Sequence, residues 1–179
     1  VYQPEARRWT EAGAAPLGRA RWGHGCALLD GKVYVVGGCA LARGAQPSVA
    51  AMETLRDCEV YCPEADEWSP IAPLRTARSG ARALAAGRCL AAVGGCNDIF
   101  GQEELLRSVE LYDPEPGVWS ALSRELQAPR PIAAAATLPR SGPEGAAQVF
   151  VMGGAAEPDS AEVYLVAPAA PAPGRLPAE

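Results

Sequence analysis

Three arginines recur at one position of a repeated block, and they are the side chains of this sequence best suited to binding chemistry. Arg21 and Arg78 each precede a double glycine by 16 residues, and Arg130 precedes one by 23. A guanidinium group forms paired hydrogen bonds with a carboxylate, so three of them together could grip acidic side chains of a peptide. The alternative is a structural role, in which they bond loop carbonyls or carboxylates of a neighbouring repeat. Both interpretations remain open from the sequence.

Four further residues share the segments that carry these arginines. Trp22 is the one tryptophan outside the repeated position, so it is either an exposed aromatic anchor or a buried packing residue. His24 is the only histidine, and burial or a loop hydrogen bond is its simplest role. All four, Arg19, Trp22, His24 and Arg75, are weaker candidates for contact with a partner than the three recurring arginines. The predicted partner-binding residues are therefore Arg21, Trp22, Arg75, Arg78 and Arg130.

The histidine and cysteine content argues against an enzyme or a metal site. A single histidine supplies neither a catalytic triad nor a set of imidazole ligands. The six cysteines lack the spacing of a secreted disulfide framework or a zinc site, so we expect free thiols in a reducing compartment. The double glycines lack the Lys-Ser or the third glycine of a phosphate-binding loop. We predict no enzymatic activity, no cofactor and no metal.

The composition narrows the class of partner. The chain has 179 residues, a net charge of −5 and a pI near 5.0, which gives no basic field for nucleic acid or anionic lipid. No apolar run approaches the roughly 20 residues of a membrane helix, and no secretory signal is apparent. We expect a protein partner, and a location in the cytoplasm with the nucleus as the alternative. Because the sequence begins at Val1 within a repeat block, it is expected to be a segment of a longer protein.

Aromatic residues and glycines define the repeat that must position these side chains. A tyrosine is followed seven residues later by a tryptophan in three places, Tyr2 with Trp9, Tyr61 with Trp68 and Tyr112 with Trp119. Tyr164 repeats the tyrosine motif without its tryptophan. Double glycines follow each tryptophan at Gly37-Gly38, Gly94-Gly95 and Gly153-Gly154. We predict structural roles for all of these residues, with the aromatic rings packed between adjacent sheets and the glycines at strand ends.

Each block contains four short strand-like runs. The first run is predicted at 23–29, 79–86 and 132–138, and the second at 32–36, 89–93 and 148–152, ending in the double glycine. The third carries the tyrosine and the fourth the tryptophan. The third block inserts Arg140 to Ala146 between its first two strands, so its hairpin should be extended. After the double glycines the segments vary in length, as recognition loops do, and Met52 to Cys58 could form a helical turn.

A period near 50 residues built from short strands predicts propeller blades and an all-β fold. The chain offers the last two strands of one blade, two whole blades and three strands of another. These are about three blades, fewer than the four to eight that close a ring. The end blades should therefore expose apolar faces. Loops before the innermost strands of a propeller meet at one rim of its channel, which places the three arginines together.

The combined motif resembles the kelch repeat. Tyr112-Asp113-Pro114 fits the family pattern, whereas Tyr61 and Tyr2 are not followed by Asp, and Gly23 to Gly38 is similar to the family consensus. The segment Pro73 to Gly80 resembles the kelch-like group. This resemblance implies a partial kelch β-propeller belonging to a six-bladed ring. It also implies that an N-terminal BTB domain, absent from this chain, joins the protein to cullin.

The predicted organisation follows the repeats. We expect the end of a first kelch repeat with its connecting loop at 1–22, kelch repeats at 23–69, 79–120 and 130–165, and a disordered Pro- and Ala-rich tail at 166–179.

The sequence leaves three candidate functions. The resemblance favours a protein–protein interaction domain that recognises substrates for a cullin-RING E3 ubiquitin ligase. The client is expected to bind through a short motif, and one form of that motif is acidic. In relatives of the kelch-like group, arginines at equivalent places are implied in substrate capture. The alternative is a scaffold that binds actin or other cytoskeletal proteins. A copper oxidase, which some kelch propellers are, would need several imidazole or phenolate ligands, and this sequence has one histidine.

Overall fold

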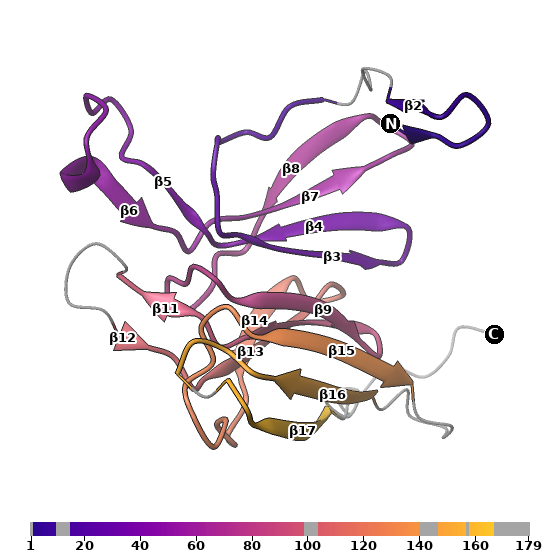
Figure 1. Ribbon diagram of the computed structural model, residues 1–179. Coiled ribbons are helices and arrows are strands. Elements are labelled where there is room, and N and C mark those ends of the chain that lie inside the picture. The colour runs from indigo at the N-terminus through magenta and orange to yellow at the C-terminus, as the bar shows by residue number, and fades with distance from the viewer. Residues whose placement is uncertain (1, 10–14, 99–103, 140–146, 157, 167–179) are drawn as a thin grey trace.

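The chain is described by a computed structural model at residues 2–9, 15–98, 104–139, 147–156 and 158–166. Its regular elements are antiparallel strands and one short 3₁₀ turn, so the prediction of an all-β partial propeller is confirmed. Three sheets lie side by side as successive blades (Figure 1). Among these residues no helix has the length and apolar character needed to cross a bilayer. The predicted long hairpin at 140–146 lies outside the described residues, and so does the predicted tail from 167 onward. The tail was predicted to begin at 166, but Val166 is buried and ends a strand at Ala161–Val166.

The first and second sheets have the same strand order. The first runs β3-β4-β7-β8, with β3 at Gly25–Leu29, β4 at Lys32–Val36, β7 at Cys58–Cys62 and β8 at Glu67–Ile71. The second runs β9-β10-β13-β14, with β9 at Arg82–Ala86, β10 at Cys89–Val93, β13 at Val109–Asp113 and β14 at Val118–Ala121. In both sheets the first strand of the repeat is the innermost and the tryptophan strand is the outermost.

The incomplete repeats lie at the two ends. The third sheet has three strands, β15 (Ala134–Pro139), β16 (Ala147–Met152) and β17 (Ala161–Val166). The N-terminal hairpin pairs β1 (Tyr2–Gln3) with β2 (Arg8–Trp9). Leu138, Met152 and Val163 of the third sheet are exposed, because no further described strand covers them. This agrees with the expectation that an end blade shows an apolar face.

Short hairpins extend from the sheets after the double glycines. They pair β5 (Cys39–Leu41) with β6 (Met52–Thr54), and β11 (Cys96–Asn97) with β12 (Glu104–Leu105). Both project from the same end of the sheets (Figure 1). The expectation of a helical turn at 52–58 is wrong: β6 and β7 occupy much of that segment, and the single 3₁₀ turn, η1 (Val49–Ala51), precedes it. Pairing of β6 with β5 accounts for the extended backbone there.

Repeated aromatic pairs pack the blades together. Tyr61 and Trp68 lie opposite each other in the sheet register with ring centroids 5.2 Å apart, and Tyr112 and Trp119 repeat this at 5.2 Å. The indole nitrogen of Trp119 donates a hydrogen bond of 2.8 Å to the carbonyl of Ala72, in the segment that leads in from the first blade. The ring is thus buried while its polar group is satisfied, as a large aromatic residue in a core requires.

The double glycines allow the next blade to approach closely. Gly94 has φ +60°, and a Cβ added there would lie 2.6 Å from the carbonyl oxygen of Arg130. The amide of Gly95 donates to that same oxygen at 3.1 Å. Since any other L-residue would be strained in this backbone conformation and would also clash, the glycines tie the loop of one blade to the strand end of the preceding one.

Candidate functional site

Each recurring arginine turns into the protein and pairs with a glutamate of the third strand of its own sheet. Arg78 Nη2 lies 2.6 Å from Glu110 Oε1, and Arg130 Nε lies 2.9 Å from Glu162 Oε1. The arginine side chains are 0–2% exposed. The three pairs are Arg21 with Glu59, Arg78 with Glu110 and Arg130 with Glu162.

The bonds of Arg78 show how the arginine fastens the loop to the strand ends. Its Nη1 donates to the carbonyl of Gly94 at 2.9 Å and to that of Ser108 at 3.1 Å, and its Nη2 also donates to Ser108 Oγ at 3.1 Å. The other two arginines repeat these contacts with the carbonyls of the first glycine and of the residue two before the glutamate, namely Gly37 and Asp57, and Gly153 and Ser160. Burial lowers the pKa of Arg78, and the charge of Glu110 beside it opposes that shift. A paired, hydrogen-bonded charge is the form in which arginine is tolerated in a core.

The glutamates hold the same loops from the other side. Glu110 Oε2 accepts a hydrogen bond of 2.7 Å from the amide of Arg75, three residues before the buried arginine. The amides of Gly18 and Gln127 donate to Glu59 and Glu162 in the same way, both at 2.8 Å. Each glutamate therefore joins two points of one loop. Each of these three glutamates precedes a repeated tyrosine by two residues, so the sequence marks them as part of the repeat. Their pairing with the arginines was not predicted.

These contacts correspond to the structural role that the sequence left open for the three arginines. The carboxylates belong to the same sheet rather than to a neighbouring one. Direct contact between these guanidinium groups and a partner stays a prediction, and it would require bonds within the loops to break. Arg75 and Trp22, by contrast, are exposed and can be reached as the fold stands.

The residues just after the arginines form the rim of the sheets. The amide of Gly80 donates to the carbonyl of Gly23 at 2.8 Å, and the amide of Ile132 donates to the carbonyl of Gly80 at 2.9 Å. All three have a left-handed backbone, with φ of +62°, +64° and +57°. Glycine adopts this conformation readily, but a β-branched residue there is an outlier. Ile132 is therefore the unusual member of the set.

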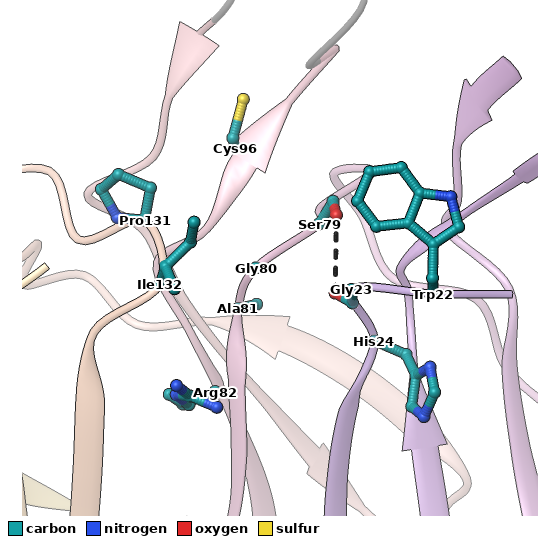
Figure 2. A pocket seen from close by; sticks show the side chains of 10 residues that line it. All are labelled: Trp22, Gly23, His24, Ser79, Gly80, Ala81, Arg82, Cys96, Pro131 and Ile132. Atoms are coloured by element: carbon teal, nitrogen blue, oxygen red, sulfur yellow. Dashed lines mark hydrogen bonds between the residues drawn. The ribbon is translucent and has the colours of Figure 1, made fainter. Parts of the chain in front are cut away.

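A cavity of about 280 Å³ opens between these rim segments. Trp22 stands at one side of it and Ile132 at the other, with Gly23 and Gly80 between them (Figure 2). Trp22 is 49% exposed and Ile132 is 68% exposed. The lining residues are Trp22, Gly23, His24, Ser79, Gly80, Ala81, Arg82, Cys96, Pro131 and Ile132.

Two nitrogen-containing ionisable side chains, Arg82 and His24, line the cavity. Arg82, the first residue of β9, donates from Nε to the carbonyl of Ala133, and no carboxylate of the described residues lies within ion-pair distance of it. His24 Nδ1 is buried and has no hydrogen-bond partner in the described part of the chain. Burial, and to a lesser extent the charge of Arg21, lowers the pKa of His24, which favours the neutral imidazole at neutral pH.

Arg19 and the cysteines, the other residues considered from the sequence, show no feature of a binding or metal site. Arg19 is held by Glu53 at 2.5 Å, by Asp57 at 3.4 Å and by the carbonyl of Leu41 at 2.7 Å, so it fastens the β5–β6 hairpin. The six cysteines form no disulfide bonds, and burial raises the pKa of the Cys58 thiol to about 11. Within the described ranges no three His, Cys, Asp or Glu side chains gather as a metal site would need.

Ile132 and Arg82 are site residues that sequence analysis missed. Both were assigned to predicted strands. Arg82 is indeed the first residue of β9, whereas β15 begins two residues after Ile132. The available signal was a break in the repeat: glycine occupies positions 23 and 80, and isoleucine occupies the third equivalent position.

Comparison with known proteins gives the same family as the fold. The family profile described as the Kelch motif matches residues 20–75 and 77–124, more than half of the chain. Kelch-like protein 25 of Xenopus tropicalis and of Homo sapiens are each 34% identical over 164 residues, 92% of this chain and 26% of theirs. Kelch-like protein 35 of Mus musculus is 29% identical over 157 residues, 88% of this chain and 23% of the relative. The chain thus spans about a quarter of the length of the curated relatives it matches.

Proposed function

The chain belongs to the kelch-repeat family, in its kelch-like group, and on that premise we propose that it recognises substrates for a cullin-RING E3 ubiquitin ligase. As a kelch-repeat chain it is a protein–protein interaction domain. The finer proposal adds the client, which binds the rim, and the ligase, which is reached through a BTB domain elsewhere in a longer protein. We place this activity in the cytoplasm or nucleus, and we propose neither catalysis nor nucleic-acid binding for the chain.

The observation that carries the proposal is the open rim between the first and third blades. Trp22 and Ile132 present exposed apolar groups on opposite sides of one cavity, although each lies only one or two residues from a fully buried arginine. Exposed large apolar groups around a cavity are a feature of protein-binding surfaces. Loops positioned by a rigid scaffold are where binding residues concentrate. The buried Arg–Glu pairs supply that rigidity.

The ligase assignment is supported by similarity rather than by a feature of the rim. The Kelch-like protein 25 relatives are about three and a half times as long as this chain, which leaves room for another domain. The net charge of −5 argues against nucleic acid as the partner.

The test is an affinity purification of the longest natural protein that contains this chain, compared with its Trp22→Ala variant. We expect both proteins to recover cullin, and only the unchanged protein to retain its client. Absence of cullin from both would overturn the ligase proposal. A client set that is unchanged in the variant would overturn the rim proposal. If filamentous actin co-sediments with the protein instead, the cytoskeletal alternative replaces both.

A further inference from the structure

We propose that two copies of this chain associate head to tail into a closed ring of six blades, in which the first sheet of each copy packs against the third sheet of the other. The two uncovered sheet faces of the chain then have the same occupant, a second copy. Neither the client nor the ligase takes part in this contact, so it goes beyond the proposed function and does not depend on it.

The second sheet shows what an interface between blades consists of, because it is covered on both sides. On one side Tyr112 and Trp119 pack in a single buried cluster with Val36 of the first sheet. On the other side Val93, the residue equivalent to Val36, lies in the cluster shared with the third sheet. Each sheet therefore has an aromatic face, which carries the Tyr–Trp pair, and an aliphatic face, which carries the residue before the double glycine. An interface joins one face of each kind.

The first sheet leaves its aromatic face uncovered by any described sheet. At one register position its four strands carry Leu28, Val33, Tyr61 and Trp68. Residues directly opposite one another lie on the same side of a sheet, so these four share one face. Tyr61 and Trp68 are only half-buried, whereas the equivalent pair of the second sheet is 6–7% exposed. Leu28 is 65% exposed.

The third sheet leaves its aliphatic face uncovered. Met152 holds the position of Val36 and Val93, directly before the double glycine. Those valines are 1% and 2% exposed, whereas Met152 is 41% exposed. Val163 lies opposite Phe150, two residues before Met152, so it shares this face, and it is 43% exposed. Burial of such apolar surface is what stabilises neighbouring blades against each other.

One copy thus carries both halves of a single type of interface at opposite ends of its three sheets (Figure 1). A surface that complements another surface of the same molecule produces head-to-tail association, which gives either a closed ring or an open filament. Propellers close with four to eight blades. Since one copy supplies three sheets, two copies supply six blades and three copies would supply nine. Two copies are therefore the number that closes the ring.

The third sheet also lacks the fourth strand of the repeat among the described residues. Pro171 stands seven residues after Tyr164, where the other repeats have tryptophan, so the sequence after β17 does not continue the motif. The hydroxyl of Tyr164 is buried and has no hydrogen-bond partner in the described part of the chain. In the first sheet the Tyr61 hydroxyl donates to Asp66 at 2.6 Å, in the turn that leads to the fourth strand. The edge of β17 is accordingly open to a strand from elsewhere.

The N-terminal strand β2 can supply this missing strand. It corresponds to the fourth strand of a blade whose two inner strands the chain does not contain, and it pairs with β1 at only two positions. In the ring, β17 of one copy takes the place of β1 beside β2 of the other. Each third sheet then has four strands, and a free strand edge, which is a liability in an isolated sheet, is removed.

The test is the molar mass of the full chain in solution, measured by size-exclusion chromatography with light scattering. We expect twice the 18.6 kDa of one copy. Leu28→Glu on the aromatic face and Met152→Glu on the aliphatic face should each weaken the dimer at least tenfold, because contact would bury an unpaired carboxylate. Val118→Glu is the matched control, since Val118 is exposed on the second sheet, between the two ends, and this variant should remain dimeric.

Mixing the two weakened variants distinguishes a head-to-tail contact from a symmetric one. A pair made of one Leu28→Glu copy and one Met152→Glu copy retains one interface without a glutamate, so the mixture should recover part of the dimer. If like faces met instead, one of the two variants would remain dimeric by itself. Recovery in the mixture also shows that both variants are folded, and Val163→Glu replaces Met152→Glu if circular dichroism shows that the latter is not.

The same measurement gives the results that would overturn the proposal. A mass of one copy at every concentration would do so, and so would masses that rise beyond two copies, since these indicate an open filament. A dimer that survives Leu28→Glu or Met152→Glu unchanged would exclude the head-to-tail ring. Because the assay contains neither client nor cullin, its failure is separate from failure of the ligase proposal.

Discussion

Neighbouring positions on the same loops differ in burial and in how regularly their residues repeat. The arginine positions, 21, 78 and 130, hold the same residue in every repeat and lie inside the protein. The rim positions, which are the next two along each loop, hold Trp22-Gly23, Ser79-Gly80 and Pro131-Ile132 and line an open cavity. Residues that repeat in this chain are therefore those that hold a blade together. Departure from the repeat marks what the blade presents to a partner.

The arginine positions repeat and the rim positions vary because only the buried arginines need fixed hydrogen-bond partners inside the chain. A buried guanidinium must have its donors bonded wherever it occurs, so the carbonyls and the glutamate around it recur with it. A rim side chain has no such internal requirement. Trp22 and Ile132 therefore differ from their counterparts without disturbing the hydrogen bonds that join Gly23, Gly80 and Ile132.

The largest effect is expected at the arginine positions. Arg78→Met leaves Glu110 buried without its partner, and breaking such a pair costs about 3–5 kcal/mol of unfolding free energy. Urea denaturation followed by circular dichroism measures the loss. The double variant Arg78→Met with Glu110→Leu should recover part of it, because no charge is left unpaired. It should not recover all of it, since Glu110 also accepts from the amides of Arg75 and Thr76.

Arg75→Met is the matched control for this prediction. Arg75 is exposed and lies on the same loop, and only its backbone amide bonds to Glu110, so its substitution should change stability little. Equal effects of the Arg75 and Arg78 variants would contradict the division between arginine and rim positions.

A smaller effect of opposite sign is expected at the rim. Ile132→Gly relieves a left-handed backbone that costs roughly 1–3 kcal/mol, against which glycine loses up to about 1 kcal/mol through the greater freedom of the unfolded chain. The net result should be a stabilisation of about 1 kcal/mol, measured by urea denaturation. Gly80→Ala, the reverse change at the equivalent position, should destabilise the chain. Loss of stability in the Ile132 variant would show that the Ile132 side chain stabilises the core, which would contradict the division between arginine and rim positions.

Much of the fold could be predicted because its signals are local. Asp30-Gly31 forms the two-residue turn between β3 and β4, with φ of +49° and +74°, as Asp-Gly between alternating runs indicates. Tyr61 and Trp68 lie opposite each other because a short turn fixes the register of the strands that carry them.

The site was less predictable because its contacts join distant parts of the chain. Arg78 and Glu110 are 32 residues apart, and no strand period links an arginine on a loop to a glutamate in a sheet. The predicted strands also began at Gly23, Ser79 and Ile132, two or three residues before the observed ones. Left-handed residues bend the chain at these points, and apolar patterning carries no information about φ.

The smallest predicted effect concerns pH and tests whether the loop around Arg21 is as closely packed as the contacts indicate. Burial first, and the charge of Arg21 second, lower the pKa of His24 below its ordinary value of 6.5. Since the unfolded chain then binds the proton more readily than the folded one, the stability due to neutral His24 is fully present above about pH 6.5. It declines as the pH falls toward the lower pKa of the folded state. His24→Gln should remove this part of the pH dependence, which is read as the difference between the two proteins in urea denaturation at pH 5 and pH 7.5. As His24 is the only histidine, NMR titration of its ring protons gives the folded pKa directly, and a value at or above 6.5 would show that the loop is open to water.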